Sequence, residues 1–93
     1  MSPASEPQDS ELAASAVAGD ERAFSWLMHR HKDGLYRFIR RYTGDADEAY
    51  DLLQETFTAA WGALKRYDRT RSFPAWLRRI ALNELRDPAA YWG

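Results

Sequence analysis

The segment from residue 45 to residue 67 most constrains how this 93-residue chain can fold, because its apolar residues recur with the period of an α-helix. Asp45 can accept hydrogen bonds from the free backbone N–H groups of the first turn, and Glu48 can reach back to it. The apolar residues that share one face are Ala49, Leu53, Phe57, Ala60, Trp61 and Leu64. We therefore expect a helix over 45–67 whose large apolar side chains, Trp61 included, are buried in a core.

The opposite face of this helix carries a polar stripe at the i, i+3, i+4, i+7 spacing, which places its members side by side. Its members are Asp51, Gln54, Glu55 and Thr58. Such a stripe is either ordinary solvated surface or a docking surface for a partner. Periodicity alone leaves both interpretations open.

Two helices are expected before this segment. A short alanine-rich helix can be capped by Asp9 or Ser10 and stopped by Gly19. A longer helix over 21–43, capped by Asp20, carries an almost unbroken apolar stripe. That stripe consists of Phe24, Leu27, Met28, His31, Leu35, Phe38, Ile39 and Tyr42.

A last helix is expected after a short polar turn over 68–72. Ser72 can cap it, Pro74 fits its first turn, where a missing N–H does no harm, and Pro88 stops it. Its apolar positions are Phe73, Trp76, Leu77, Ile80, Ala81 and Leu85. The sequence shows no strand pattern. The fold class is therefore predicted to be all-α, a compact bundle of three main helices plus a short N-terminal helix.

The expected organisation is one small domain over 9–87. Hydrophobic residues make up 45% of the chain and aromatic residues 14%, which is enough for a core without covalent cross-links. Residues 1–8, with two prolines and mostly small or polar side chains, predict a disordered tail. Residues 88–93 are expected to be a second tail or the start of a truncated linker.

The sequence offers no constellation of catalytic or metal-binding residues. It has no cysteine, and its five glycines are scattered rather than gathered in a phosphate-binding loop. His29 and His31 point in different directions on a helix, and His31 falls on the apolar stripe. The acidic residues of 45–55 lack the loop spacing of calcium ligands. We therefore expect no enzyme, cofactor or metal site.

No apolar run approaches the ~20 residues of a membrane span. No charged start followed by an apolar run marks a signal peptide. The pattern predicts a soluble cytoplasmic domain.

Charge is divided sharply between two parts of the chain, although the net charge is only −1. Residues 45–55 carry −5, and residues 65–86 carry +5. Such asymmetry indicates two surfaces with different partners, or two patches that neutralise each other.

The basic segment combines residue types that suit nucleic acid. Arg66, Arg69 and Arg71 surround the turn, and Arg79 and Asn83 follow on the helix side of Trp76 together with Arg86. Arginines attract phosphates, asparagine can pair with a base edge, and aromatic rings offer stacking faces for an extruded base. The alternative is a solvated basic face with Trp76 in the core, and spacing alone leaves both open.

Several motifs in this order resemble region 2 of a bacterial RNA polymerase sigma factor, in particular the extracytoplasmic-function (ECF) group. They are Asp51-Leu52-Leu53-Gln54-Glu55-Thr56-Phe57, then Trp61, then Leu64-Lys65-Arg66-Tyr67-Asp68, then Phe73-Pro74-Ala75-Trp76-Leu77-Arg78-Arg79-Ile80-Ala81-Leu82-Asn83. Earlier residues also fit, namely Ala23-Phe24, Leu27, His31 and Leu35-Tyr36-Arg37-Phe38. The similarity covers about residues 10–87.

The resemblance implies a transcription-initiation module with two binding surfaces. The helix over 45–67 would dock on the coiled coil of the polymerase β′ subunit through Asp51, Gln54, Glu55 and, on the same stripe, Thr58. The turn and the last helix would read the promoter −10 element as single-stranded non-template DNA and help to melt it. The residues expected at that DNA are Lys65, Arg66, Arg69, Arg71, Ser72, Trp76, Arg79 and Asn83. The resemblance also implies an anti-sigma factor as a partner.

One departure from the ECF pattern lies on the C-terminal side of the domain. ECF factors continue through a linker into region 4, a helix-turn-helix that reads the −35 element, whereas this sequence ends at Gly93. We expect an excised domain rather than a degenerate or regulatory fragment. The alternative function is a sigma-like decoy that binds an anti-sigma regulator without binding promoters, but a decoy would not need Arg79, Asn83 and the basic turn.

Overall fold

The computed structural model describes residues 7–86, which form four α-helices and one short 3₁₀ helix and contain no strand. The helices are α1 (Asp9–Val17), α2 (Glu21–Arg40), α3 (Ala46–Ala63) and α4 (Phe73–Arg86), with the 3₁₀ helix η2 (Leu64–Arg66) directly after α3. The expected all-α class is therefore confirmed. The predictions for residues 1–6 and 87–93, including the stop at Pro88, lie outside the described residues.

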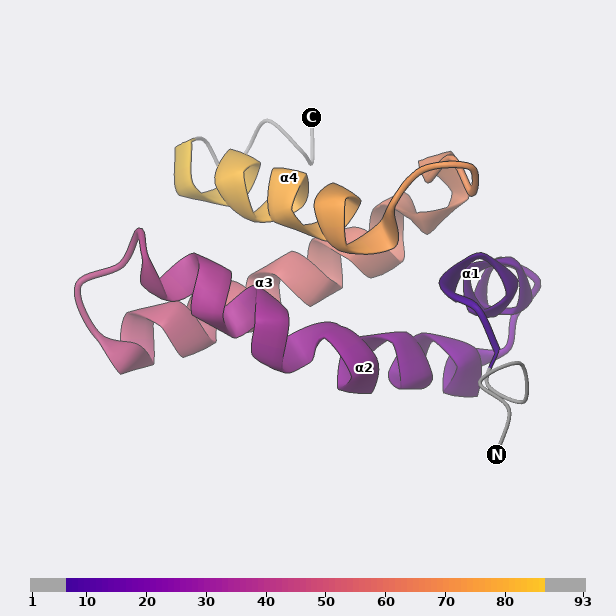
Figure 1. The fold of residues 1–93 in the computed structure, drawn as a ribbon, viewed down its shortest axis with the longest axis horizontal. Helices are drawn as coiled ribbons and strands as arrows, with labels where there is room; N and C mark the ends of the chain where they lie inside the picture. Colours follow the sequence, from indigo (N-terminus) through magenta and orange to yellow (C-terminus); the bar gives the residue numbers. More distant parts are fainter. Residues whose placement is uncertain (1–6, 87–93) are drawn as a thin grey trace.

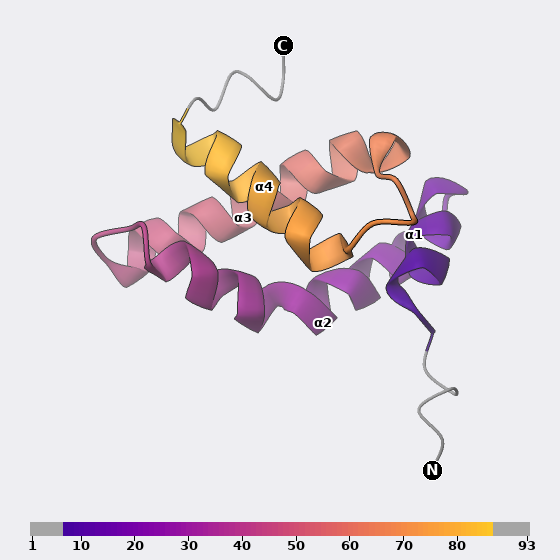
Figure 2. The ribbon, with the colours of Figure 1, turned by 45° about the horizontal axis from the view of Figure 1, so that its top comes forward.

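Helix α3 lies against both α2 and α4, and α4 also contacts α2 (Figures 1 and 2). Helix α1 packs on the N-terminal part of α2, and it also contacts η2. The core lies where these helices meet, and its most buried large side chains are Leu27, Ile39, Phe73, Leu77 and Ile80. The turn between η2 and α4 is thereby placed beside α1 at one end of the bundle.

Local sequence signals set most helix boundaries. Asp20 Oδ1 accepts from the Arg22 N–H at 3.0 Å, and Asp45 Oδ1 accepts from the Glu48 N–H at 2.7 Å, as expected for N-caps. Ser72 Oγ likewise accepts from the Ala75 N–H at 3.2 Å. Helix α1 ends before Gly19, whose φ of +114° suits a residue without a Cβ.

The start of α1 differs from the prediction. Neither Asp9 nor Ser10 is its N-cap; that position belongs to Gln8, whose N–H donates to Glu11 Oε1 at 2.8 Å. The Asp9 carboxylate is instead directed to Arg30 and His31 of α2. A contact distant in sequence thus replaces the expected local cap.

The buried face of α3 is broader than the sequence pattern indicated. Leu52, Thr56, Ala59 and Ala63 are buried in addition to the expected positions, because α3 packs against both α2 and α4. The Thr56 hydroxyl is satisfied inside this interface, donating to the Leu52 carbonyl at 2.7 Å. Helices α2 and α3 also end earlier than expected, at Arg40 and Ala63.

Candidate functional site

The acidic stripe lies on the solvent side of α3. Asp51, Gln54, Glu55 and Thr58 are all exposed, and the helix start at Asp45 fixes their rotation relative to the core. The Thr58 hydroxyl donates to the Gln54 carbonyl at 3.0 Å, so it is occupied within the helix. Two carboxylates, one amide and the Thr58 hydroxyl as an acceptor therefore remain as polar groups available on this side.

Trp61 lies on this same side, and its predicted burial is wrong. Its side chain is 44% exposed, and it sits i+3 from Thr58 and i+7 from Gln54. One part of the ring packs on Phe24 of α2, with ring centroids 4.9 Å apart. Leu52 and Thr56 of α3 are buried, whereas Trp61 lies at the margin of the core, so the stripe ends in an aromatic surface.

A second surface surrounds the turn between η2 and α4. A hollow of about 580 Å³ is lined by Arg66, Tyr67, Asp68, Arg71, Ser72, Ala75, Trp76 and Arg79. Three aromatic rings stand together at this place: Tyr67 lies 5.1 Å from Trp76 and 5.3 Å from Phe73, and Phe73 lies 5.6 Å from Trp76. Phe73 is almost fully buried and Trp76 is only partly so, which leaves part of the indole facing solvent.

The turn itself is held by a local network. The Tyr67 hydroxyl donates to the Arg71 carbonyl, and the Arg71 N–H donates to the Asp68 carbonyl at 2.9 Å. Asp68 Oδ1 accepts from both the N–H and the hydroxyl of Thr70. These bonds hold the backbone of residues 67–71 in one conformation and so define one side of the hollow.

The pKa values of two titratable groups of the hollow are shifted in opposite directions. Hydrogen bonds from Thr70 and the nearby charge of Arg71, 3.7 Å away, lower the pKa of Asp68. Burial raises the pKa of the Tyr67 hydroxyl, and the charges of Asp9 and Asp68 raise it further. At neutral pH the hollow therefore holds a carboxylate and a neutral phenol among its arginines.

Five of the eight residues predicted to meet DNA line this hollow, namely Arg66, Arg71, Ser72, Trp76 and Arg79. Arg69 lies on the other side of the turn, where it lines a shallow hollow with α1. Lys65 and Asn83 line neither hollow; Lys65 is exposed and Asn83 is half-buried. Tyr67 and Asp68 were not singled out as site residues, although both belong to the Leu64–Asp68 motif.

Glu84 is a further residue that the sequence pattern did not identify. Its side chain is only 6% exposed in α4, and burial together with the charge of Glu55 raises its pKa. Within residues 7–86, no group hydrogen-bonds its buried Oε2. A carboxyl group of α4 thus lies close enough to Glu55 of the acidic stripe to be influenced by its charge.

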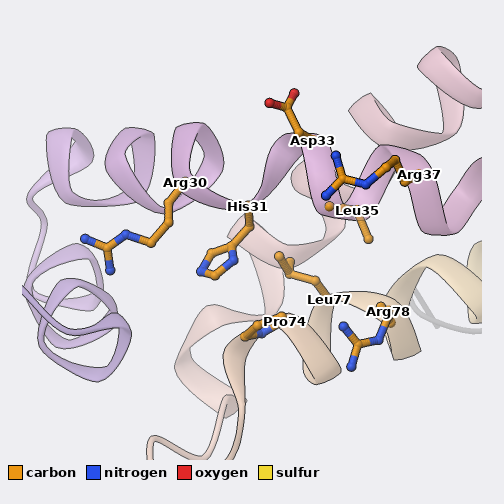
Figure 3. Close-up of a pocket in the computed structure, with 9 residues that line it drawn as sticks. Arg30, His31, Asp33, Leu35, Arg37, Pro74, Leu77 and Arg78 are labelled. Carbon is orange, nitrogen blue, oxygen red and sulfur yellow. The ribbon is translucent and has the colours of Figure 1, made fainter.

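A third hollow, of about 330 Å³, lies between α2 and α4 (Figure 3). Leu35, Leu77 and Pro74 supply its apolar lining, and Arg37 and Arg78 stand at its edge. Arg78 also lies over the Phe38 ring, 5.8 Å from its centroid. Across residues 7–86, no cluster of three potential metal ligands forms, and no helix has the length and apolar character required to cross a membrane.

Comparison with known proteins identifies this arrangement. The family model for sigma-70 region 2 matches residues 27–90. The chain belongs to the sigma-70 region 2 family. Family members are DNA-binding transcription-initiation factors rather than enzymes, in agreement with the expectation from the sequence.

Individual relatives support the ECF group. The chain is 43% identical over 83 residues to the RNA polymerase sigma factor CnrH of Cupriavidus metallidurans, covering 87% of this chain and 44% of CnrH. It is 38% identical over 65 residues to the ECF RNA polymerase sigma factor SigW of Bacillus subtilis, covering 70% of this chain and 35% of SigW. The chain therefore spans less than half the length of these curated relatives.

Two solved structures share the fold. An NMR structure of an engineered region 2 of sigmaE in complex with GTAAAA matches with a TM-score of 0.83 and 32% identity, over 97% of this chain and 92% of that chain. CnrH in complex with the cytosolic domain of CnrY matches with a TM-score of 0.76 and 44% identity, over 85% of this chain and 51% of that chain. The expected sigma region 2 fold is thereby confirmed.

Proposed function

We propose that this domain recognises the −10 element of a promoter as single-stranded non-template DNA and docks on the β′ coiled coil of RNA polymerase. The observation that carries the DNA half is the hollow of arginines and aromatic rings at the turn before α4. The fold similarity to a sigmaE region 2 bound to GTAAAA supports it. A domain with this role works in the cytoplasm, where polymerase and chromosome are.

The hollow fits a nucleotide that has left the base stack. Trp76 offers a partly exposed ring for stacking, and Arg66 and Arg79 offer positive charge to the flanking phosphates. The Asp68 carboxylate can accept from an exocyclic amino group of a base, as acidic side chains do when they contact cytosine. Lys65, Arg69 and Asn83, outside the hollow, extend the basic surface along the strand.

The free energies of base extrusion and base stacking limit what the isolated domain can do. Extruding a paired base costs a few kcal/mol, and stacking on an aromatic ring returns about 1–3 kcal/mol per base. These terms nearly cancel for one hollow, so the isolated domain binds strands that are already single and leaves melting to the complex with polymerase.

Fluorescence anisotropy with labelled GTAAAA, single-stranded and in a duplex, tests the DNA half. We expect weak, salt-sensitive binding that favours the single strand, because phosphate contacts release counterions. Arg79→Ala should weaken it about three- to tenfold, whereas Arg22→Ala, which removes an exposed arginine on α2, should not. Equal affinity for duplex and single strand would overturn this half of the proposal.

The acidic stripe supports the polymerase half. Asp51, Gln54 and Glu55 are exposed on one side of α3, and Trp61 adds an aromatic surface at its end. Charged groups around a large aromatic side chain are typical of an interface anchor. The stripe lies on α3, and the DNA hollow is built by η2, the turn and α4, so the two partners do not compete for the same residues.

Pull-down with the β′ coiled coil tests the polymerase half. Asp51→Arg should abolish capture while far-ultraviolet circular dichroism stays unchanged, because the side chain is exposed. Asp33→Arg makes the same charge change at an exposed position of α2 and should leave capture intact. Undiminished capture of Asp51→Arg would refute the docking assignment.

An anti-sigma partner is proposed for the same domain. CnrH was solved in complex with the cytosolic domain of CnrY, and the present chain aligns with that structure over 85% of its length. A decoy that binds only such a regulator is less well supported, since it would not require the arginines gathered around the hollow.

A further inference from the structure

The first residue of α1 makes two contacts with α2. Asp9 Oδ1 accepts from Arg30 Nη1 at 2.9 Å, and Asp9 Oδ2 lies 2.9 Å from His31 Nε2. Figure 3 shows the Arg30 side chain directed toward α1 and the His31 ring directed toward the start of α4 at Pro74. Asp9 therefore contacts two adjacent residues of α2, of which Arg30 is directed toward α1 and His31 toward the start of α4.

This contact is partly shielded from water. The side chains of Asp9, Arg30 and His31 are between 16% and 25% exposed. Hydrogen bonds between charged partners in such surroundings are stronger than those on an open surface. The two contacts therefore fix the His31 ring relative to α1 more firmly than a solvated ion pair would.

Ring contacts connect His31 to the residues that line the DNA hollow. Its ring centroid lies 5.5 Å from that of Phe73, and Phe73 contacts both Tyr67 and Trp76. Phe73 is 1% exposed, so it has little room to move independently of the rings around it. A chain of direct contacts thus runs from Asp9 through His31 and Phe73 to the two aromatic residues that line the hollow.

We propose that Asp9 and His31 are positioning residues for DNA recognition. Through contacts on the buried side, they fix the positions of the three rings of Tyr67, Phe73 and Trp76, here called the aromatic wall, and they do not touch the nucleic acid. The inference rests on the proposed DNA-binding function of the hollow. It assigns a role to α1, which lies N-terminal to residues 27–90 that match the family model. Without the Asp9 contact, the His31 ring should move more freely, and the rings of the aromatic wall should then occupy a wider range of positions. The hollow should therefore discriminate less well between bases.

The test measures the affinity of the 93-residue chain for two single-stranded probes, GTAAAA and a cytosine hexamer, at low temperature. Asp9→Asn removes the charge with little change of shape. His31→Gln keeps a polar group but has no ring to pack on Phe73, and it serves as a second variant. Asp33→Asn is the matched control, because it removes one acidic charge from an exposed position of α2 that does not line the hollow proposed for DNA.

We expect Asp9→Asn and His31→Gln each to weaken GTAAAA binding about fivefold while changing cytosine-hexamer binding little. Their double variant should be no weaker than His31→Gln, because both changes break one contact chain. Asp33→Asn should keep the wild-type ratio of affinities.

Three outcomes separate the possibilities. If wild-type protein binds neither probe, the proposed function itself fails. If the wild type discriminates and both single variants keep its affinity and ratio, the positioning inference is overturned. If both variants lose stability and bind the two probes equally less well, with an unchanged ratio, Asp9 and His31 serve the fold alone and the inference is again overturned.

Discussion

Replacing Glu84 should stabilise this domain, and the gain should depend on pH. Glu84 is 6% exposed in α4, and no described residue hydrogen-bonds its buried Oε2. A buried acceptor without a partner costs about 1–3 kcal/mol. Glu84→Gln removes the charge but keeps a polar group, so we expect the free energy of unfolding to rise by about 1 kcal/mol near neutral pH. Glu84→Met removes both carboxylate oxygens at similar side-chain volume and should raise the free energy of unfolding by about 2 kcal/mol.

The sign of the pH dependence follows from the direction of the shift. Burial and the neighbouring charge of Glu55 raise the pKa of Glu84 in the folded protein above its ordinary value of 4.5. The folded state therefore binds the proton more tightly than the unfolded state does. Stability from the protonated form is fully present below the ordinary pKa and is lost as the pH rises through the raised one. The advantage of Glu84→Gln should thus be small near pH 4 and reach its full size above the raised pKa.

Urea unfolding followed by circular dichroism at several pH values between about 4 and 8 measures this difference. For a domain of this size, about 1 kcal/mol corresponds to a rise of roughly 4–8 °C in Tm. Asp51→Asn is the control, because this exposed carboxylate of α3 should change stability by less than about 0.5 kcal/mol at any of these pH values. A difference between Glu84→Gln and wild type that is constant across the range, or a loss of stability, would refute the reasoning.

Four further substitutions, the last two compared with each other, test local features by the same unfolding assay. Tyr67→Phe loses the hydrogen bond to the Arg71 carbonyl and should cost about 1 kcal/mol while keeping the ring contacts; no loss would mean that the bond does not hold the turn. Gly19→Ala should cost about 1–2 kcal/mol, since φ is +114° and no atom crowds the position; an unchanged midpoint would contradict the backbone assignment. Trp61→Ala should cost about 1 kcal/mol, against about 3–5 kcal/mol for Phe73→Ala, and equal losses would show that Trp61 belongs to the core.

Much of the fold follows from local patterns that the sequence displays. Asp20, Asp45 and Ser72 cap the helices that their positions predicted, and Gly19 ends α1 with a positive φ. These signals act over three or four residues, so they can be recognised without knowing the tertiary structure. The acidic stripe could be recognised for the same reason.

The remaining features depend on how the helices pack, which the periodicity of a single helix does not specify. The pairing of Asp9 with Arg30 and His31 joins positions more than 20 residues apart, so the local preference of aspartate for an N-cap gave the wrong expectation. The aromatic wall likewise brings Tyr67 against residues on the next helix. Motif resemblance pointed to the stretch of chain that forms the hollow, but only the packing separates Trp76, which lines the hollow, from the buried Phe73.

The misjudged burial of Trp61 and the unrecognised Glu84 have one physical cause. Helix α3 packs against both α2 and α4, and its buried side includes Leu52, Thr56 and Ala63, so the core-facing side of α3 is displaced from Trp61. The same packing turns Glu84 of α4 inward, toward the charge of Glu55. The surface proposed for polymerase and the helix proposed for DNA therefore share an interface that contains an unpaired carboxyl group.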